Sequence, residues 1–238
     1  MKPPPVEPVF VDTPAQAMGE LHTELVIVDR FKFQITKPVD SYDMLDAHAV
    51  REANKRDEYM PYWADIWPVG RMLAKAVAKQ NWAEFPTTDG KVEALELGCG
   101  LGIPGLTALA RGLRVTFSDY DLAALRFTAD NARANNLFDF RTLPLDWRFP
   151  PAGVQFPVIL GADLTYELRN IDPLAALIKK MLLPGGLCLL TDQDRTPAPV
   201  LRQKLGEYGL RYRTEKVRAG EPGGFRMQGT LYRITHAE

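Results

Sequence analysis

The sequence predicts an α/β protein with a doubly wound, mostly parallel β-sheet and helices on both faces. From residue 91 onward, short apolar runs rich in β-branched residues alternate with amphipathic, helix-like segments, the pattern of βαβ units. The final two strand-like runs, 210–217 and 227–234, have no helix between them. We therefore expect the sheet to end in an antiparallel hairpin.

Length and composition favour a single folded domain. The chain has 238 residues, is 46% hydrophobic and carries a net charge of −1, which provides enough apolar material for a core and excludes a wholly disordered chain. No apolar run reaches the roughly 18 residues of a membrane span. The first ten residues, MKPPPVEPVF, lack the apolar region of a secretory signal. We expect a cytoplasmic, monomeric protein with no membrane partner.

The cysteine, histidine and charge content of the chain limits which metals and partners are expected. Two cysteines and three histidines offer neither a disulfide framework nor a zinc-ligand spacing, so no metal is expected. The near-neutral charge makes nucleic acid an unlikely partner and leaves proteins and small molecules. An acidic first third and a basic C-terminal end suggest either ordinary solvated surface or a rim that favours a cationic partner.

The N-terminal part should form an extension to the core. Residues 1–20 are proline-rich and acidic, and we expect a flexible tail there. The alternating β-branched and aromatic residues of 23–36 predict a hairpin. A helix over 41–56, capped by Ser41 or Asp40, follows. The prediction is thus one domain over 21–238, with an extension at 21–60 and a core at 61–238. The extension is either a cover over a pocket or a docking surface.

The core elements follow in order. Pro68 opens a helix with Met72, Leu73 and Val77 on one face. The predicted strands are 92–97, 114–118, 140–145, 156–162 and 187–191. The predicted helices are 106–110, 121–136, 174–183 and 199–208, and the Pro-Gly-Gly at 184–186 should end the third of them.

A glycine-rich loop, ELGCGLGIPG at 96–105, lies between a predicted strand and a predicted helix. Glycines are needed where a ligand approaches the backbone closely or where φ is positive. Amide groups at the start of a helix favour negatively polarised ligand atoms. Asp119 ends the next predicted strand, about 20 residues on, where a carboxylate can accept both hydroxyls of a ribose. The loop and Asp119 together predict a nucleoside site.

Two ligand classes compete for this loop. Residues 100–105 match the G-x-G-x-x-G fingerprint of dinucleotide-binding proteins. In that register the first glycine follows the strand directly, whereas here Gly98 is the first glycine and the acidic Glu96 ends the strand. A glycine-rich turn without a ligand is the third possibility.

The chain resembles the S-adenosylmethionine (SAM)-dependent methyltransferases, whose seven-stranded, Rossmann-like members share the Glu-x-Gly-x-Gly-x-Gly pattern. More narrowly, it is similar to methyltransferase family 16, which includes small non-histone protein-lysine methyltransferases. Four segments in order carry the resemblance: YWADIWPVGRMLA at 62–74, LELGCGLGIPG at 95–105, LDW at 145–147 and ILGADLTY at 159–166. The glycine loop indicates only the superfamily; the other three segments are more specific.

The resemblance implies a role for each matching residue. Trp67 should pack over the methionine end of SAM, Gly98, Cys99 and Gly100 should line the amino-acid and ribose portion, and Ala162 should lie beside the sulfonium. Asp119 should bind the ribose, Tyr120, Asp146 and Trp147 should surround the adenine, and Asp163 and Tyr166 should form the mouth where the acceptor enters. For Trp63, Trp67, Asp146 and Asp163 the ordinary alternatives are core aromatics, a turn cap and a loop polar residue.

The resemblance also implies a reaction. We expect methyl transfer from SAM to an amine, with S-adenosyl-L-homocysteine (SAH) as product and a protein lysine as acceptor. Asp163 should hold the incoming ammonium by a charge-assisted hydrogen bond, and no dedicated general base is expected. The alternatives are a small-molecule amine as acceptor and a non-catalytic SAM-binding protein. Asp192 and Asp194 should be loop carboxylates, and Cys99 a small turn residue without a nucleophilic role.

Overall fold

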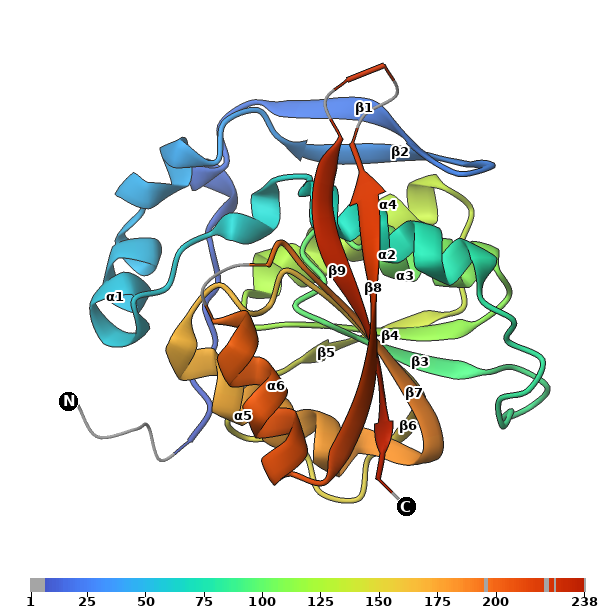
Figure 1. Cartoon of the computed structure of the whole chain (residues 1–238). Helices are drawn as coiled ribbons and strands as arrows, with labels where there is room; N and C mark the ends of the chain where they lie inside the picture. Colours follow the sequence, from blue (N-terminus) through green and yellow to red (C-terminus); the bar gives the residue numbers. More distant parts are fainter. Residues whose placement is uncertain (1–6, 195–196, 221–222, 225, 238) are drawn as a thin grey trace.

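The computed structural model describes residues 7–194, 197–220, 223–224 and 226–237, and its centre is a seven-stranded sheet (Figure 1). Its strand order is β5-β4-β3-β6-β7-β9-β8. The strands are β3 (Glu93–Leu97), β4 (Arg114–Asp119), β5 (Phe140–Pro144), β6 (Phe156–Ala162), β7 (Leu182–Asp192), β8 (Leu210–Ala219) and β9 (Met227–His236). The α-helices are α1 (His48–Asp57), α2 (Pro68–Lys79), α3 (Ile103–Ala110), α4 (Leu122–Ala134), α5 (Leu168–Met181) and α6 (Ala198–Glu207).

The sheet confirms the predicted fold class. β5, β4, β3, β6 and β7 are parallel, whereas β9 lies antiparallel between β7 and β8. β8 and β9 pair over their whole length, from Leu210 opposite His236 to Ala219 opposite Met227. This is the C-terminal hairpin that follows from the absence of a helix between the two runs.

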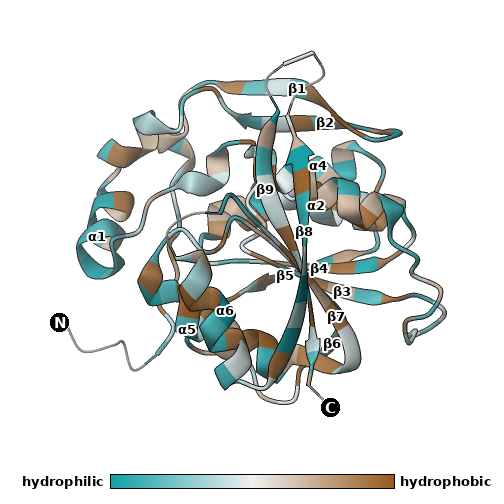
Figure 2. Cartoon of the chain, viewed as in Figure 1, coloured by the Kyte–Doolittle hydropathy of each residue, from teal (hydrophilic) through white to brown (hydrophobic). Residues whose placement is uncertain are grey.

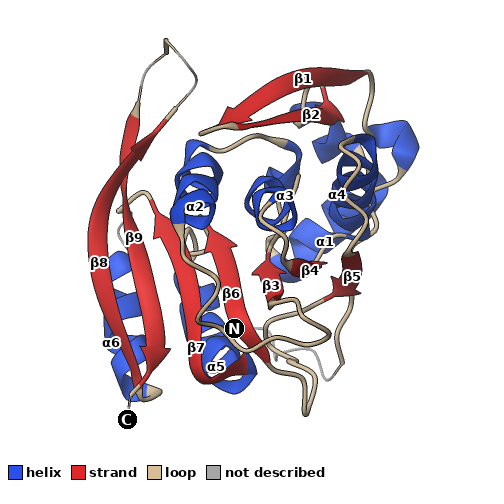
Figure 3. Cartoon of the chain, turned by 90° about the vertical axis from the view of Figure 1, so that its right-hand side faces the viewer, coloured by secondary structure: helices blue, strands red, loops and turns tan. Residues whose placement is uncertain are grey.

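Helices cover both faces of the sheet (Figure 3). α2, α3 and α4 pack on one face, and α5 and α6 on the other. The central strands β3 and β6 are buried almost throughout, which explains why β6 is apolar over its whole length. The outer helices carry both apolar and polar faces (Figure 2). In the part of the chain that the structure describes, every helix is too short or too polar to cross a membrane.

A separate two-stranded sheet lies over α2, α3 and α4 (Figures 1 and 3). It is the predicted N-terminal hairpin, formed by β1 (Leu21–Val28) and β2 (Phe31–Pro38). Two asparagines, Asn131 in α4 and Asn135 at its C-terminal cap, satisfy one edge of β2. Asn135 accepts from and donates to the backbone of Gln34, both at 2.8 Å, and Asn131 accepts from the Thr36 amide at 2.8 Å and donates to the Thr36 carbonyl at 3.2 Å. The hairpin therefore completes the core rather than projecting from it.

Part of the predicted flexible tail, around Val11, is held against the core. Val11 is 3% exposed and Thr13 is fully buried. The Val11 amide donates to the Tyr120 carbonyl at 3.2 Å, and the Val11 carbonyl accepts from the Leu122 amide at 2.9 Å. The composition of this segment is typical of a flexible chain, but its hydrogen bonds to the residues that follow β4 hold Val11 in place. Residues 1–6 of the predicted tail lie outside the described part.

Two predicted helices have different bounds. The segment 41–56 is split into a 3-10 helix at Tyr42–Asp46 and α1, with an extended Ala47 between them. Met44 and Val50 are both buried, and residues six apart face different sides of one continuous helix, so the break lets both reach the core.

The helix expected at 174–183 begins earlier, at Leu168, and contains Pro173. It ends at Met181, and β7 then runs through the Pro-Gly-Gly segment. Leu182 pairs with Phe156 and Leu187 with Val158. The intervening residues form an irregularity in the strand, where proline and glycine are tolerated.

Candidate cofactor and acceptor site

The loop after β3 approaches its surroundings too closely for side chains. Gly98, Gly100 and Gly102 all have left-handed φ values, of 55°, 53° and 79°. A Cβ on Gly98 would lie 2.8 Å from the Leu164 side chain, and one on Gly100 would lie 3.2 Å from the Trp63 carbonyl oxygen. The conformation and the packing both require glycine at these positions, and they leave the loop backbone open to a ligand.

Glu96 ties the end of β3 to the first turn of α3. Its Oε2 accepts from the Gly105 amide at 2.9 Å, and the side chain is buried. Burial raises the pKa of Glu96 well above its usual range. A Cβ on Gly105 would lie 2.3 Å from both Glu96 Oε2 and the Phe117 ring. Glu96 and the fourth glycine of the motif thus position the loop.

Cys99 behaves as the small turn residue that was expected. Its amide donates to the Ser118 carbonyl at 2.9 Å, and its Sγ lies 3.6 Å from Thr128 Oγ1. Burial raises the pKa of the thiol well above its usual range, which disfavours the thiolate that a nucleophile requires.

Asp119, at the end of β4, has a carboxylate that is held by backbone amides. Its Oδ2 accepts from the Gly100 amide at 2.9 Å and its Oδ1 from the Asp121 amide at 3.0 Å. Each oxygen offers two lone pairs, so the carboxylate retains acceptor capacity beyond these two bonds. Burial raises the pKa of Asp119 to about 6. Its remaining acceptor capacity is what the expected ribose contact would use.

Asp121 is a buried hub behind Asp119 that the sequence analysis missed. Its carboxylate accepts from the Thr13 hydroxyl at 2.5 Å, the Tyr59 hydroxyl at 2.5 Å and the Trp63 indole N–H at 3.0 Å. It also caps α4 by accepting from the Ala123 amide. The hub joins two N-terminal segments to the Asp119 loop.

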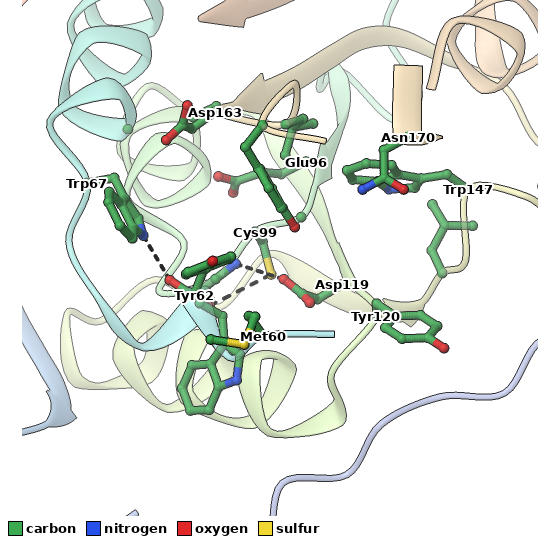
Figure 4. A pocket seen from close by; sticks show the side chains of 18 of the residues that line it. Met60, Tyr62, Trp67, Glu96, Cys99, Asp119, Tyr120, Trp147, Asp163 and Asn170 are labelled. Atoms are coloured by element: carbon green, nitrogen blue, oxygen red, sulfur yellow. Dashed lines mark hydrogen bonds between the residues drawn. The ribbon is translucent and has the colours of Figure 1, made fainter. Parts of the chain in front are cut away.

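Tyr120 and Trp147 lie at one end of the site in Figure 4, with Asp119 nearer the middle, and Asp146, which precedes Trp147 in the chain, lines the same cavity. The Tyr120 hydroxyl donates to Asp57 Oδ2 at 2.6 Å. Arg148 donates to both Asp146 oxygens and forms an ion pair with Asp57 at 3.3 Å. Asp57 ends α1, so the N-terminal extension forms part of the wall at the adenine end that the resemblance implies.

Trp67, Ala162, Asp163 and Tyr166 belong to the opposite end, where Figure 4 shows Trp67 and Asp163. Asp163 follows β6 with a left-handed φ of 55°, and its amide donates to the Thr191 carbonyl at 2.9 Å. Its Oδ2 accepts from Gln193 Nε2 at 2.8 Å. Burial raises the pKa of Tyr166 above its usual range. Both residues thus lie where a parallel strand ends at the ligand edge of the sheet.

One cavity of about 850 Å³ connects these two ends. All of the predicted site residues line it: Trp67, Gly98, Cys99, Gly100, Asp119, Tyr120, Asp146, Trp147, Ala162, Asp163 and Tyr166. Asp192 and Asp194 are not among its lining residues; Asp194 instead pairs with Lys216 at 2.6 Å. Sequence reasoning missed Asp57, Tyr59 and Met60 of the extension and Asn170 of α5. No local motif marks those positions, because they reach the cavity only through tertiary packing.

The fold and this cavity define a protein of the SAM-dependent methyltransferase class. A family model described as "Lysine methyltransferase", methyltransferase family 16, matches residues 56–200. The chain belongs to this family, and the resemblance drawn from its motifs is confirmed.

Similar proteins include methyltransferases of different acceptors. The chain is 31% identical over 107 residues to a histidine protein methyltransferase 1 homolog of Dictyostelium discoideum, covering 42% of this chain and 35% of that one. It is 31% identical over 139 residues to a ubiquinone biosynthesis O-methyltransferase of Psychrobacter cryohalolentis, covering 56% and 52%. The chain therefore spans about a third to a half of the length of these relatives.

A solved structure shares the fold. The glycopeptide N-methyltransferase MtfA, complexed with SAM, aligns with a TM-score of 0.56 at 14% identity, over 72% of this chain and 96% of that one.

The residues of the cavity fit SAM as the cofactor. The Asp119 carboxylate, which accepts from two backbone amides at the cavity wall, keeps lone pairs that suit the hydroxyls of a ribose. The glycine loop gives backbone access beside them, and the aromatic side chains Trp67 and Trp147 belong to opposite ends of the cavity. The donor set thus suits a nucleoside that carries a cationic sulfur group.

Proposed function

We propose that this protein transfers a methyl group from SAM to the amine of a lysine side chain on a protein partner. The observation that carries the proposal is the access to Asp163. Tyr62, Trp67 and Tyr166 line the cavity, yet they remain 43%, 36% and 36% exposed. A side chain on a folded partner can therefore enter from the surface, whereas an enzyme for a small amine usually encloses its substrate.

The residues of the cavity supply position and electrostatics. SAM brings a methyl group activated by a positively charged sulfur. Asp119 orients the ribose, and the backbone of Gly98 and Gly100 lines the loop side of the cofactor. Ala162, at the end of β6, leaves space between the cofactor and the acceptor mouth. Holding the acceptor in line with the methyl group is the main source of rate enhancement in this arrangement.

Asp163 orients the acceptor amine in this proposal. An ammonium that enters the cavity meets a carboxylate held by Gln193 and by the strand end, and a charge-assisted hydrogen bond fixes its nitrogen. Burial beside the apolar wall lowers the pKa of the amine, so the ammonium gives its proton to bulk water through the exposed mouth before the methyl group is transferred. The free lone pair of the nitrogen is then directed into the cavity.

The comparisons support a protein acceptor more directly than a small molecule. The family description is lysine methyltransferase, and one relative is named as a protein histidine methyltransferase. A second candidate function, methylation of a small molecule, has support from the ubiquinone O-methyltransferase relative. The two candidates share the cofactor site and differ only at the mouth.

Labelled SAM distinguishes the candidates. The full chain is incubated with methyl-labelled SAM and cell lysate, and protein and metabolite fractions are analysed by mass spectrometry. Label on lysine of a protein is expected. Label confined to small molecules would support the second candidate, and no SAM binding by calorimetry would refute both.

The variant Asp163→Asn tests the proposed role of the carboxylate. Asparagine tolerates the left-handed conformation and keeps an acceptor for Gln193 but removes the charge. We expect loss of transfer with SAM affinity retained. The control Asp89→Asn changes a carboxylate whose side chain is 83% exposed and outside the cavity, and it should leave both unchanged. Equal turnover in Asp163→Asn would remove this role from Asp163.

A further inference from the structure

Three aromatic side chains form a group at the acceptor end of the cavity, here called the aromatic mouth: Tyr62, Trp67 and Tyr166. The Tyr62 ring is in the middle. Its centroid lies 6.1 Å from that of Trp67, with 82° between the ring planes, and 5.4 Å from that of Tyr166, with 80° between the planes. Both pairs are edge-to-face, the favourable geometry for aromatic contacts. The group is therefore an ordered surface and not three independent exposed rings.

The backbone holds the aromatic mouth in place. The Trp67 indole N–H donates to the Tyr62 carbonyl at 2.8 Å, seen as a dashed line in Figure 4. Its only polar hydrogen is thus occupied, so the indole meets a ligand through apolar and π surface. Exposed aromatic groups of this kind next to a cavity are typical of binding sites.

The charges near the aromatic mouth favour a cation. Asp163 and Glu167 line the same cavity. The cation beside them, Arg169, is paired with Glu167 at 2.6 Å and with Glu58 at 3.2 Å, so this group of carboxylates and one guanidinium carries an excess of negative charge. Aromatic rings attract cations through their faces, and a long alkylammonium also places an apolar stem against such walls.

We propose that the aromatic mouth binds the alkyl stem and ammonium of the acceptor, and that Tyr62 determines specificity for this class. Tyr62 touches both other rings, so its removal separates Trp67 from Tyr166. It lies outside the Asp-x-x-Tyr element, and its ring contacts are with the other two rings of the mouth. The inference rests on the proposed function for the reaction, but it concerns binding and is tested by binding alone.

The test uses a matched pair of probes on the SAH-saturated full chain. Nα-acetyl-lysine amide carries the ammonium, and Nα-acetyl-norleucine amide has a similar stem without the charge. Binding is followed by NMR through the aromatic ring signals, and SAH affinity is measured separately by calorimetry. The variants are Tyr62→Ala, Tyr62→Phe and the control Tyr42→Ala, whose residue is 75% exposed and not part of the cavity lining.

The lysine probe should bind at least about fivefold more tightly than the norleucine probe. Tyr62→Ala should weaken the lysine probe by roughly three- to fivefold, whereas Tyr62→Phe and Tyr42→Ala should not, and SAH affinity should stay the same in all variants. Equal binding of both probes, or no effect of Tyr62→Ala, would overturn the inference while SAH binding and methyl transfer stand. Absence of SAH binding would instead refute the proposed function.

Discussion

The carboxylate of Asp119 offers the sharpest test of how this chain binds its cofactor. In the structure it accepts from the amides of Gly100 and Asp121, and its remaining lone pairs are the acceptors that we expect for the ribose hydroxyls. Asp119→Asn has nearly the same shape but replaces one acceptor oxygen by a donor group. One ribose hydrogen bond to a charged acceptor is lost and the other is weakened. Such bonds contribute about 1.5–3 kcal/mol each, so we expect a loss of about 2–4 kcal/mol, or roughly 30- to 700-fold in SAM affinity.

Titration calorimetry with SAM or SAH near neutral pH measures this loss directly. Circular dichroism and thermal unfolding confirm that the variant is folded. The control Asp46→Asn alters a carboxylate that is 97% exposed, and its affinity should stay within about twofold of the parent because exposed charges contribute little. A folded Asp119→Asn protein whose affinity falls less than about fivefold would refute the assignment of the ribose to Asp119.

Further predictions concern pH, the buried hub and the glycine loop. Since burial raises the pKa of Asp119 to about 6, SAM binding should weaken as the pH falls below about 6. The contribution of this group to the stability of the unliganded fold should instead increase as the pH falls from 6 to 4. A pH titration of SAM affinity and of unfolding free energy tests these opposite signs, and Asp119→Asn should reduce both pH dependences. Asp121→Ala leaves several buried donors unsatisfied and removes a helix cap, and urea unfolding should show a loss of about 3–5 kcal/mol; a loss below about 1 kcal/mol would contradict the hub. Gly105→Ala places a Cβ 2.3 Å from the Phe117 ring and should destabilise the fold by about 1–3 kcal/mol. The control Gly206→Ala in α6 places a Cβ with nothing within 4 Å, and the same unfolding assay should show an unchanged or slightly higher stability.

The sequence predicted the central sheet well because its signals are local. The strand β6 is an apolar run, the glycine-rich loop marks the end of β3, and Pro68 marks the start of α2. Errors arose where tertiary contacts outweighed composition. The segment around Val11 looks disordered but pairs with the end of β4, and Pro173 lies inside α5 although proline usually marks a helix boundary.

The residues of the candidate site also fall into two groups, those that the sequence predicts and those that only the tertiary structure brings to the cavity. Gly98, Asp119 and Asp163 follow strand ends in recognisable motifs, and the topology of a parallel sheet brings such ends to one edge. Asp57 carries no motif of its own, and Tyr62, although it begins the segment 62–74, received no role from the sequence. They reach the cavity only because the N-terminal segments fold back across that edge, where Asp57 pairs with Arg148 and Tyr62 contacts Tyr166.

By itself, the sequence determined the class of sheet, the glycine loop and the carboxylates at the strand ends, because periodicity, glycine and residue type act over a few neighbouring positions. The tertiary structure alone decided what surrounds them. It made the N-terminal extension a wall of the cavity, and it placed Asp121 behind Asp119 as the acceptor for groups from Thr13, Tyr59 and Trp63. Thr13 lies 108 positions before this carboxylate in the chain, and a contact of that range depends on the packing of the whole fold.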